Sequence, residues 1–234
     1  MKTFVVVPTY NELENIENLL EEILKHEVEA VVVDDNSPDC TWKAVEDVSK
    51  REPRVHLLRR MEERGRGNAG KAGFLYALEK GAEQVVEMDA DFSHNPKDIP
   101  RLLEKLKECD VVLGSRMIQG GEEVGRGIIR RIVTRAANLY IRFLLGLKAK
   151  DCNSGFRAFR RKVLEAIAPG IRAQGPGIVQ EVLFKAHLKG FRICEIPIVF
   201  KDRTSGESKL GLKQLAQGYT LILKLRLMRL FGRI

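Results

Sequence analysis

Long apolar runs and paired cysteines are the features that this sequence most lacks. No apolar run approaches the roughly 18 residues expected of a membrane-spanning helix. No signal peptide opens the chain, because the strand-like residues 4–7 stand where its longer apolar region would begin. The cysteines are widely scattered and form no CxxC pair: Cys40, Cys109, Cys152 and Cys194. The sequence therefore indicates neither a zinc site nor a disulfide framework, and a reduced cytosolic setting is expected.

The charge of the chain is unbalanced toward basic residues. There are 40 Lys and Arg residues against 32 Asp and Glu, which leaves a formal net charge of +8 and a pI of about 9.4. Such an excess favours polyanionic partners, namely phosphates, anionic lipid or nucleic acid. No recognised nucleic-acid-binding motif accompanies the charge, so no nucleic-acid partner is expected. With 234 residues, 44% of them apolar, the chain suits one compact α/β domain.

Short apolar, β-branched runs alternate with helical patterns along the chain. This alternation predicts a mostly parallel central sheet flanked by helices on both faces. The predicted strands are residues 4–7, 30–33, 55–58, 84–88, 111–113 and 193–200, the last of them interrupted by Pro197.

Helix signals fall between these runs. Asn11 followed by Glu14 predicts an N-cap and capping box for a helix whose apolar face contains residues 16, 19, 20 and 23. Pro96 predicts the first turn of a helix that ends near Glu108. Residues 128–147 read as a long helix in which Arg is interleaved with large apolar residues.

Four of the predicted strands are each followed by a polar segment. These segments are residues 8–12, 34–38, 89–91 and 114–116. Ligands of such sheets bind beyond the carboxyl ends of the strands. We therefore expect polar groups from all four segments to converge on one crevice.

The segment Asp89-Ala90-Asp91 places two carboxylates at a predicted strand end. A turn there can aim both at one divalent ion, and Mg²⁺ or Mn²⁺ prefers such hard oxygen ligands and bridges a diphosphate at the same time. In the simpler alternative, one Asp caps the following helix and the other is solvated. The flanking strand and the acidic turn at 34–35 favour the metal, and Asp35 is suited to accept hydrogen bonds from a nucleobase or ribose.

Six motifs occur in order along the chain: PTYNE at 8–12, VDDNSPD at 33–39, MDADFSHNP at 88–96, GSR at 114–116, DCNSGFRAF at 151–159 and DRTSGESKL at 202–210. On these motifs the chain, from Phe4 to about Leu212, resembles the dolichol-phosphate mannose synthases within the inverting glycosyltransferase family 2. The resemblance implies a GT-A nucleotide-sugar-binding fold. It also implies transfer of mannose from GDP-mannose to dolichyl (polyprenyl) phosphate with inversion, which gives dolichyl-phosphate mannose for glycan assembly.

The resemblance further implies roles for individual residues. The nucleoside would be held by Pro8, Tyr10, Glu12, Val33 and Asp35. The diphosphate and its metal would be held by Asp89, Ala90 and Asp91, with Ser93 as a further metal ligand. Phosphate charge would be neutralised by Arg116, Arg203 and Lys209, which together with Asp91 form the predicted catalytic set.

The charge of the acceptor suggests the mechanism. A lipid phosphate monoester has a second pKa near about 6, so at neutral pH it is mostly a dianion and needs no general base. The protein then has to align acceptor and sugar carbon and to stabilise the departing nucleoside diphosphate. Arg116, Arg130 and Arg131 are candidates to clamp the acceptor phosphate, since guanidinium matches phosphate with two donors. A solvated helix face is the alternative for Arg130 and Arg131.

Two segments are candidates for a membrane surface. The helix at 128–147 fits the headgroup region of a bilayer, where anionic lipid attracts Arg and the apolar side inserts shallowly. We expect residues 1–212 to form the catalytic domain and residues 213–234 an amphipathic C-terminal helix, with a core-covering helix as the alternative. The protein is then expected to be peripheral on the cytoplasmic face of a membrane, and a membrane-anchoring protein is a candidate partner.

Several other functions compete with sugar transfer to a lipid phosphate. An NTPase is disfavoured, because residues 65–72 are one residue short of a P-loop and Ala72 stands where the Ser or Thr of that motif should be. A dinucleotide-dependent oxidoreductase is also disfavoured, because residues 8–12 occupy the place where GxGxxG would follow the first strand. A UDP-glucose-dependent polyprenyl-phosphate glucosyltransferase and a non-catalytic sugar-nucleotide-binding module both remain open. Surface or capping roles are expected for the four histidines: His26, His56, His94 and His187.

Overall fold

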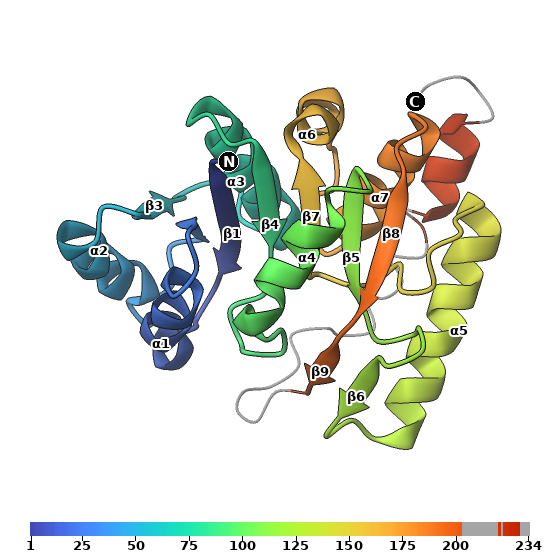
Figure 1. The fold of residues 1–234 in the computed structure, drawn as a ribbon, viewed down its shortest axis with the longest axis horizontal. Coiled ribbons are helices and arrows are strands. Elements are labelled where there is room, and N and C mark those ends of the chain that lie inside the picture. Colours follow the sequence, from blue (N-terminus) through green and yellow to red (C-terminus); the bar gives the residue numbers. More distant parts are fainter. Residues whose placement is uncertain (203–219, 221, 230–234) are drawn as a thin grey trace.

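A seven-stranded sheet forms the centre of the computed structural model, which describes residues 1–202, 220 and 222–229 (Figure 1). The strand order is β3-β2-β1-β4-β7-β5-β8. These strands are β1 (Thr3–Thr9), β2 (Glu29–Asp34), β3 (Val55–Arg59), β4 (Gln84–Glu87), β5 (Val111–Ser115), β7 (Arg157–Arg160) and β8 (Ile193–Pro197). All neighbours are parallel except at β7. The predicted mostly parallel α/β sheet is confirmed.

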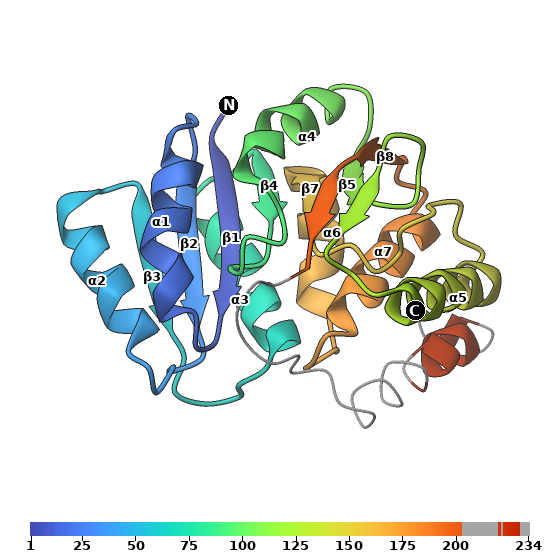
Figure 2. The same ribbon diagram turned by 90° about the horizontal axis from the view of Figure 1, so that it is seen from below.

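Apolar side chains alternate between the two faces of this sheet. In β1, Val5 and Val7 pack with one layer of helices, whereas Phe4 and Val6 pack with the other, because successive side chains of a strand point to opposite faces. The first layer contains α1 (Leu13–Leu24), α2 (Thr41–Arg51), the short 3₁₀ helix η1 (Pro96–Asp98) and α4 (Ile99–Lys105). The second contains α3 (Arg66–Glu79), α6 (Arg161–Ile167), η2 (Ala168–Gly170) and α7 (Ile178–Leu188). Figure 2 shows both layers.

The antiparallel strand β7 is not among the predicted strands. Its four residues begin and end with Arg and match no apolar run. β7 runs opposite to β4 and β5, so its first residue, Arg157, pairs with Glu87 and Leu113 near the carboxyl ends of those strands. The segment before β7, residues 151–156, is thereby brought to the carboxyl ends of β4 and β5, where residues 89–91 and 114–116 lie.

The first helix has the predicted apolar face but not the predicted cap. All four apolar positions at 16, 19, 20 and 23 are buried in α1. The capping box of Asn11 and Glu14 is wrong, since the helix begins after Glu12 and that residue makes no side-chain cap bond. The Leu13 N–H instead donates to Asp39 Oδ2 at 3.1 Å. A carboxylate from the loop before α2 thus replaces a local cap.

Two other predicted helices begin where expected. Pro96 opens η1, which continues into α4 and ends at Lys105, three residues before the predicted end. The long helix α5 (Ile128–Leu145) ends at Gly146, whose positive φ of 69° suits a left-handed C-cap. Both boundaries are close to those predicted.

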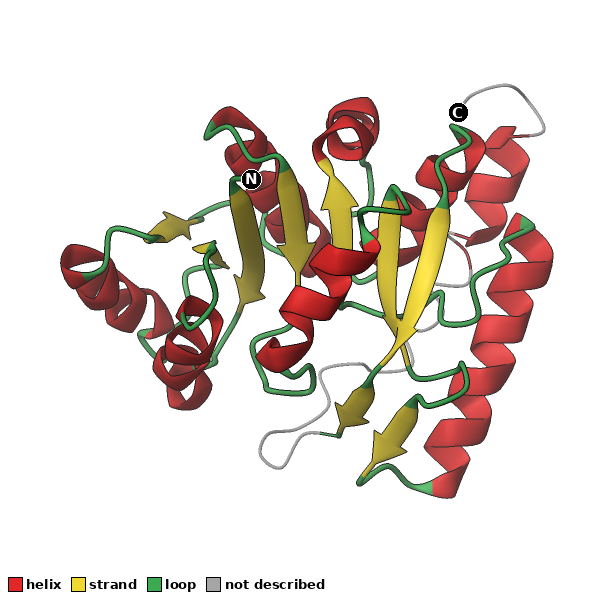
Figure 3. Cartoon of the chain, viewed as in Figure 1, coloured by secondary structure: helices red, strands yellow, loops and turns green. Residues whose placement is uncertain are grey.

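Pro197 interrupts the last predicted strand, as expected. β8 ends there, and β9 (Val199–Lys201) pairs instead with β6 (Glu122–Val124) in a separate two-stranded sheet (Figure 3). Near the end of the chain, residues 220 and 222–229 are helical. Within this segment Ile222 and Leu225 are buried in the same core as Ile141 and Leu145 of α5. The rest of the predicted terminal helix, and the boundary after residue 212, lie outside the described residues.

The expected absence of a disulfide is wrong. Cys109, just before β5, is bonded to Cys194 in β8, with their Cα atoms 6.2 Å apart. The two residues are 85 positions apart, and only the parallel pairing of β5 with β8 brings them together. Cys40 and Cys152 are free. Among the described residues, no helix is long and apolar enough to cross a membrane.

Candidate active site

The first two polar segments are joined by hydrogen bonds. Thr9 Oγ1 donates to Asp34 Oδ2 at 2.9 Å, and Ser37 Oγ donates to the same carboxylate at 2.6 Å. The Asn11 N–H in turn donates to Ser37 Oγ at 3.0 Å. Asp34 is fully buried and therefore serves to hold the loops after β1 and β2 against each other.

The neighbouring Asp35 is the predicted nucleoside ligand. It is 5% exposed and accepts from Arg60 Nη1 at 2.7 Å and from the Gly65 N–H at 2.6 Å. Burial raises the pKa of this carboxyl, and the Gly65 N–H and Arg60 oppose the shift only in part. The four other predicted nucleoside ligands lie at or near the carboxyl ends of β1 and β2. They are Pro8 in β1, Tyr10 and Glu12 in the following loop, and Val33 in β2, whose side chain is in the core.

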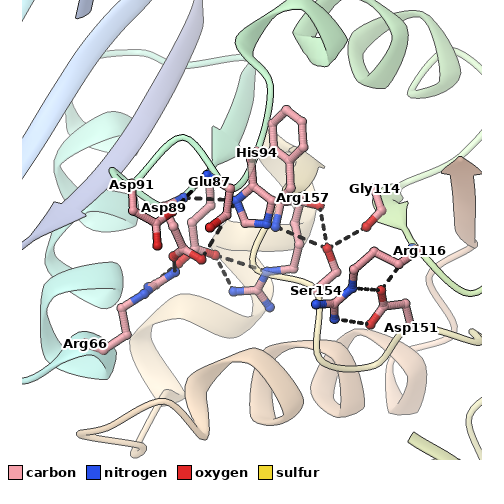
Figure 4. Close-up of polar contacts among 12 residues, drawn as sticks. Arg66, Glu87, Asp89, Asp91, His94, Gly114, Arg116, Asp151, Ser154 and Arg157 are labelled. Atoms are coloured by element: carbon pink, nitrogen blue, oxygen red, sulfur yellow. Dashed lines mark hydrogen bonds and ion pairs between the residues drawn. The ribbon is translucent and has the colours of Figure 1, made fainter. Parts of the chain in front are cut away.

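The two carboxylates predicted to bind metal lie in the turn that follows β4. Asp91 Oδ1 accepts from the Ser93 N–H at 3.0 Å, which stabilises the turn, and Ser93 itself is 3% exposed. The Asp89 carboxylate lies against Gly155, where an added Cβ would come within 2.9 Å of Asp89 Oδ2. Figure 4 shows both acids at one side of the same cluster of charged side chains.

His94 is a buried part of this cluster, so the surface or capping role expected for it is wrong. Its side chain is 2% exposed and its Nδ1 accepts from the Asp89 N–H at 3.3 Å. The ring stacks on Phe156 with centroids 5.2 Å apart. His94 therefore supports the acidic turn from inside.

A buried ion network lies beneath the acidic turn. Glu87, the last residue of β4, is fully buried and pairs with Arg157, which is 1% exposed, and with Arg66 Nη1 at 2.6 Å. Burial raises the pKa of the Glu87 carboxyl, but Arg157 and Arg66 lower it by more, so it lies below its ordinary value. The guanidinium of Arg66 also reaches Asp89 Oδ1 at 3.2 Å. The network thus links the end of the sheet to the predicted metal ligands.

Arg116 is held by a carboxylate outside the predicted set. Its Nε and Nη2 donate to the two oxygens of Asp151 at 2.8 and 2.9 Å, and its backbone N–H also donates to Asp151. Burial lowers the pKa of Arg116, whereas Asp151, Glu123 and Asp89 raise it by more. Its guanidinium is therefore charged and fixed in place close enough to Asp89 for the two charges to interact.

The predicted acceptor residues lie at the start of α5. Arg130 is exposed and pairs with Asp202 at 3.1 Å. Arg131 Nη2 donates to the Glu123 backbone oxygen at 2.6 Å. Two further predicted residues, Arg203 and Lys209, lie outside the described residues.

The acidic turn suits a hard divalent cation. It offers carboxylate oxygens from Asp89 and Asp91, and the side chain of Asp89 is 35% exposed. Among residues 1–202, 220 and 222–229, no three His, Cys, Asp or Glu side chains gather into a metal site. Two carboxylates leave coordination positions for water and for a diphosphate, as Mg²⁺ and Mn²⁺ sites on phosphate substrates usually do. The residues present therefore fit Mg²⁺ or Mn²⁺ held jointly with a substrate.

Five residues of the cluster are absent from the predicted set: Arg66, Glu87, His94, Asp151 and Arg157. Asp151 and Arg157 stand inside the motif at 151–159, and Arg66 stands inside the Gly-rich segment 65–72. The motifs that contain Asp151, Arg157 and Arg66 could have identified these residues as candidates. Their partners could not have been identified from the sequence, because the pairings depend on how β4, β7 and α3 meet.

Gly155→Ala is expected to weaken binding of Mn²⁺ together with GDP by about tenfold, with little change in thermal stability. The new Cβ would lie 2.9 and 3.3 Å from the two Asp89 oxygens, whereas ordinary contact begins at 3.4 Å, so the carboxylate has to move by about 0.5 Å. Sites of this kind tolerate displacements of only about 0.5 Å. Isothermal titration calorimetry measures the change.

Gly175→Ala is the matched control, since a Cβ there meets nothing within 4 Å. If Gly155→Ala and Gly175→Ala bound Mn²⁺ and GDP equally well, the predicted role of Asp89 as a metal ligand would be contradicted.

The sequence of this chain matches a known protein family and is similar to individual known proteins. Residues 4–168 match the model of the family "Glycosyl transferase family 2". An undecaprenyl-phosphate mannosyltransferase from Micrococcus luteus is 40% identical over 214 residues, which cover 90% of this chain and 88% of that protein.

Two solved structures share the fold. One is a glucosyl-3-phosphoglycerate synthase from Mycobacterium tuberculosis, with Mn²⁺ and UDP bound, at a TM-score of 0.69 and 21% identity over 97% of this chain and 79% of that one. The other is a mannosyltransferase from Pyrobaculum calidifontis with GDP-Man and Mn²⁺, at a TM-score of 0.63 and 23% identity over 95% of this chain and 64% of that one. The predicted GT-A fold is confirmed, and this chain belongs to glycosyl transferase family 2.

Proposed function

We propose that this protein transfers mannose from GDP-mannose to the phosphate of a polyprenyl or dolichyl phosphate, with inversion at the sugar carbon. The observation that carries the proposal is the 40% identity to an undecaprenyl-phosphate mannosyltransferase over 90% of the chain. The cluster after β4 supports it, because acidic and basic groups that suit a metal-bound diphosphate lie together there. The product, dolichyl-phosphate mannose or its polyprenyl equivalent, would serve glycan assembly.

On the donor side, Asp35 would accept hydrogen bonds from the nucleoside, next to Pro8, Tyr10, Glu12 and Val33. Its carboxylate is oriented by Arg60 and Gly65, so the protein needs little reorganisation to present it. Asp89 and Asp91 would hold Mg²⁺ or Mn²⁺, which would supply positive charge to stabilise the departing nucleoside diphosphate.

On the acceptor side, the lipid phosphate would approach the start of α5. Arg130 and Arg131 would contact it there, and Arg116, Arg203 and Lys209 would neutralise phosphate charge. The acceptor dianion attacks without a general base, so the side chains chiefly position it in line with the sugar carbon. In-line displacement in a single step accounts for inversion.

A lipid acceptor requires contact with a membrane, and α5 supports this part of the proposal. Large apolar residues recur every three or four positions along the helix, and those most exposed are Ile129 (78%) and Phe143 (88%). Their stripe lies on the side of α5 opposite the buried Ile141 and Leu145, since the helix repeats every 3.6 residues. Contiguous exposed apolar surface of this kind, flanked by Arg, suits shallow insertion at a cytoplasmic membrane face. Residues 213–234, or an anchoring protein, would add to this contact.

Phe143→Asp is expected to reduce binding to anionic liposomes by about tenfold while the fold is retained. Burying a Phe side chain contributes about 1.5–3 kcal/mol, and about 1.4 kcal/mol corresponds to a factor of ten. Flotation with vesicles of phosphatidylcholine and phosphatidylglycerol measures the effect. Met61→Asp is the control, because Met61 is 59% exposed on a loop between β3 and α3. Unchanged flotation of the Phe143 variant would count against the contact.

The proposed reaction is tested by incubating the protein with GDP-mannose, UDP-glucose, Mn²⁺ and a short polyprenyl phosphate, followed by mass analysis of the products. A polyprenyl-phosphate mannose product supports the proposal. The alternative with an observation of its own is glucose transfer from UDP-glucose, because the fold is shared with a synthase that binds UDP. A glucose product, or hydrolysis without transfer, would overturn the mannose assignment, and absence of any turnover would favour a sugar-nucleotide-binding module.

A further inference from the structure

The Arg66 guanidinium bridges two carboxylates of the candidate active site. Nη1 donates to Glu87 Oε1 at 2.6 Å, and Nη2 donates to Asp89 Oδ1 at 3.2 Å (Figure 4). Glu87 is held on its other side by Arg157. Two cations and two anions therefore alternate from Arg157 to Asp89, and the formal charges of these four residues cancel.

The surrounding backbone is shaped to leave room for this bridge. A Cβ at Gly70 would come within 3.2 Å of both Arg66 Nη1 and Glu87 Oε1, and a Cβ at Gly155 would come within 2.9 Å of Asp89. Arg66 is the first residue of α3, whose start is fixed because the Gly67 N–H donates to the Gln174 oxygen at 2.8 Å. The guanidinium is thus held at Asp89 by its own backbone and by Glu87.

This arrangement affects the binding of any cation at Asp89. Arg66 carries a permanent positive charge, and its side chain is only 21% exposed, so water screens it little. A divalent cation on the Asp89 carboxylate would be repelled by that charge and would compete with it for Oδ1. A nucleoside diphosphate brings enough negative charge to compensate for both cations.

We propose that Arg66 is a built-in counter-cation of Asp89, which weakens metal binding at the donor-free site and couples entry of the metal to entry of the nucleoside diphosphate. This role rests on the proposed function, since it assumes that Asp89 is a metal ligand. Arg66 is a positioning residue in this role. It keeps the Asp89 carboxylate oriented before the substrate arrives, and it is available to the diphosphate afterwards.

The test is a comparison of Mn²⁺ binding by the wild type and Arg66→Met, with and without saturating GDP. Electron paramagnetic resonance of free Mn²⁺ gives the dissociation constants without any turnover. In the wild type, GDP should strengthen Mn²⁺ binding. In Arg66→Met, Mn²⁺ should bind about tenfold more tightly than in the wild type when GDP is absent, and the gain from GDP should shrink by about the same factor. By reciprocity, the gain in GDP affinity caused by Mn²⁺ shrinks equally.

Three further variants separate charge from structure. Arg66→Lys keeps the charge and should keep most of the coupling. Arg101→Met removes one exposed Arg that pairs with Asp98, and it should leave every constant unchanged. If Arg66→Met does not fold, Arg66→Gln removes the same charge but retains a side-chain amide that can donate to Glu87, and it should show the same loss of coupling.

Two results would overturn the proposal in distinguishable ways. If the Mn²⁺ affinity of Arg66→Met were within twofold of the wild type, with an unchanged gain from GDP, the role of Arg66 would be excluded and the metal assignment would stand. Failure of the wild type itself to bind Mn²⁺ even with GDP would exclude the metal assignment, and with it both the proposed donor site and the role of Arg66.

Discussion

Asp91→Ala is expected to lower kcat by about 10³-fold, which abolishes sugar transfer in practical terms, while the protein remains folded. The substitution removes one of the two carboxylates proposed to bind the metal, and loss of a single preorganised electrostatic contact costs about 10²–10³-fold in typical enzymes. The structural cost is small, because Asp91 is partly exposed and the described hydrogen bond from the Ser93 N–H is one local contact in a turn. Product formation from GDP-mannose and a short polyprenyl phosphate, with circular dichroism as the check on folding, measures both parts.

Two variants isolate the charge of Asp91. Asp91→Asn retains an oxygen that can accept from Ser93 but loses the negative charge, so its activity should be close to that of Asp91→Ala. Asp47→Ala removes an exposed carboxylate on α2 and should have no effect on turnover. Near-normal turnover by folded Asp91→Ala protein would refute the metal assignment.

Glu87→Leu is expected to lower the free energy of unfolding by about 3–5 kcal/mol, the usual cost of removing one partner from a buried ion pair. Glu87 is fully buried and neutralises Arg157, which is itself 1% exposed. Without it, Arg157 keeps its hydrogen bond to the Val179 oxygen but loses its counter-charge. Urea denaturation followed by circular dichroism gives the change in stability.

The double variant Glu87→Leu/Arg157→Leu decides whether the lost stability comes from an uncompensated charge. Removing both charges should recover a large part of the loss, since apolar replacements of a whole buried pair are often nearly neutral. If the double variant were less stable than Glu87→Leu by the full cost of a second substitution, the packing of the two side chains would be the cause instead.

The acidic turn could be predicted because its signal is local. Asp89 and Asp91 directly follow an apolar run that predicts a short buried strand. Polar side chains just after the carboxyl end of such a strand can reach solvent. The same reasoning predicted the buried face of α1, since a helix repeats every 3.6 residues and the apolar positions at 16, 19, 20 and 23 fall on one side. Both inferences needed only neighbouring residues and the geometry of one element.

The partners of these residues could not be predicted in the same way. Asp151 is separated from Arg116 by 35 positions, Arg157 from Glu87 by 70, and Arg66 from Asp89 by 23. β7 carries Arg at both ends and has no apolar run, yet it inserts between β4 and β5 in the opposite direction. The capping of α1 by Asp39 and the disulfide between Cys109 and Cys194 depend on contacts of the same long-range kind.

The sequence by itself determined the parallel strands of the central sheet, their alternation with helices and the acidic turn that follows β4, because these follow from local apolar periodicity. Only the tertiary structure decided which charges meet. A charged side chain in a folded protein pairs with whatever the backbone brings within about 4 Å, and that depends on strand order and direction rather than on spacing along the chain. The antiparallel insertion of β7 is the clearest case, since it places Arg157 beside Glu87 and carries Asp151 to Arg116.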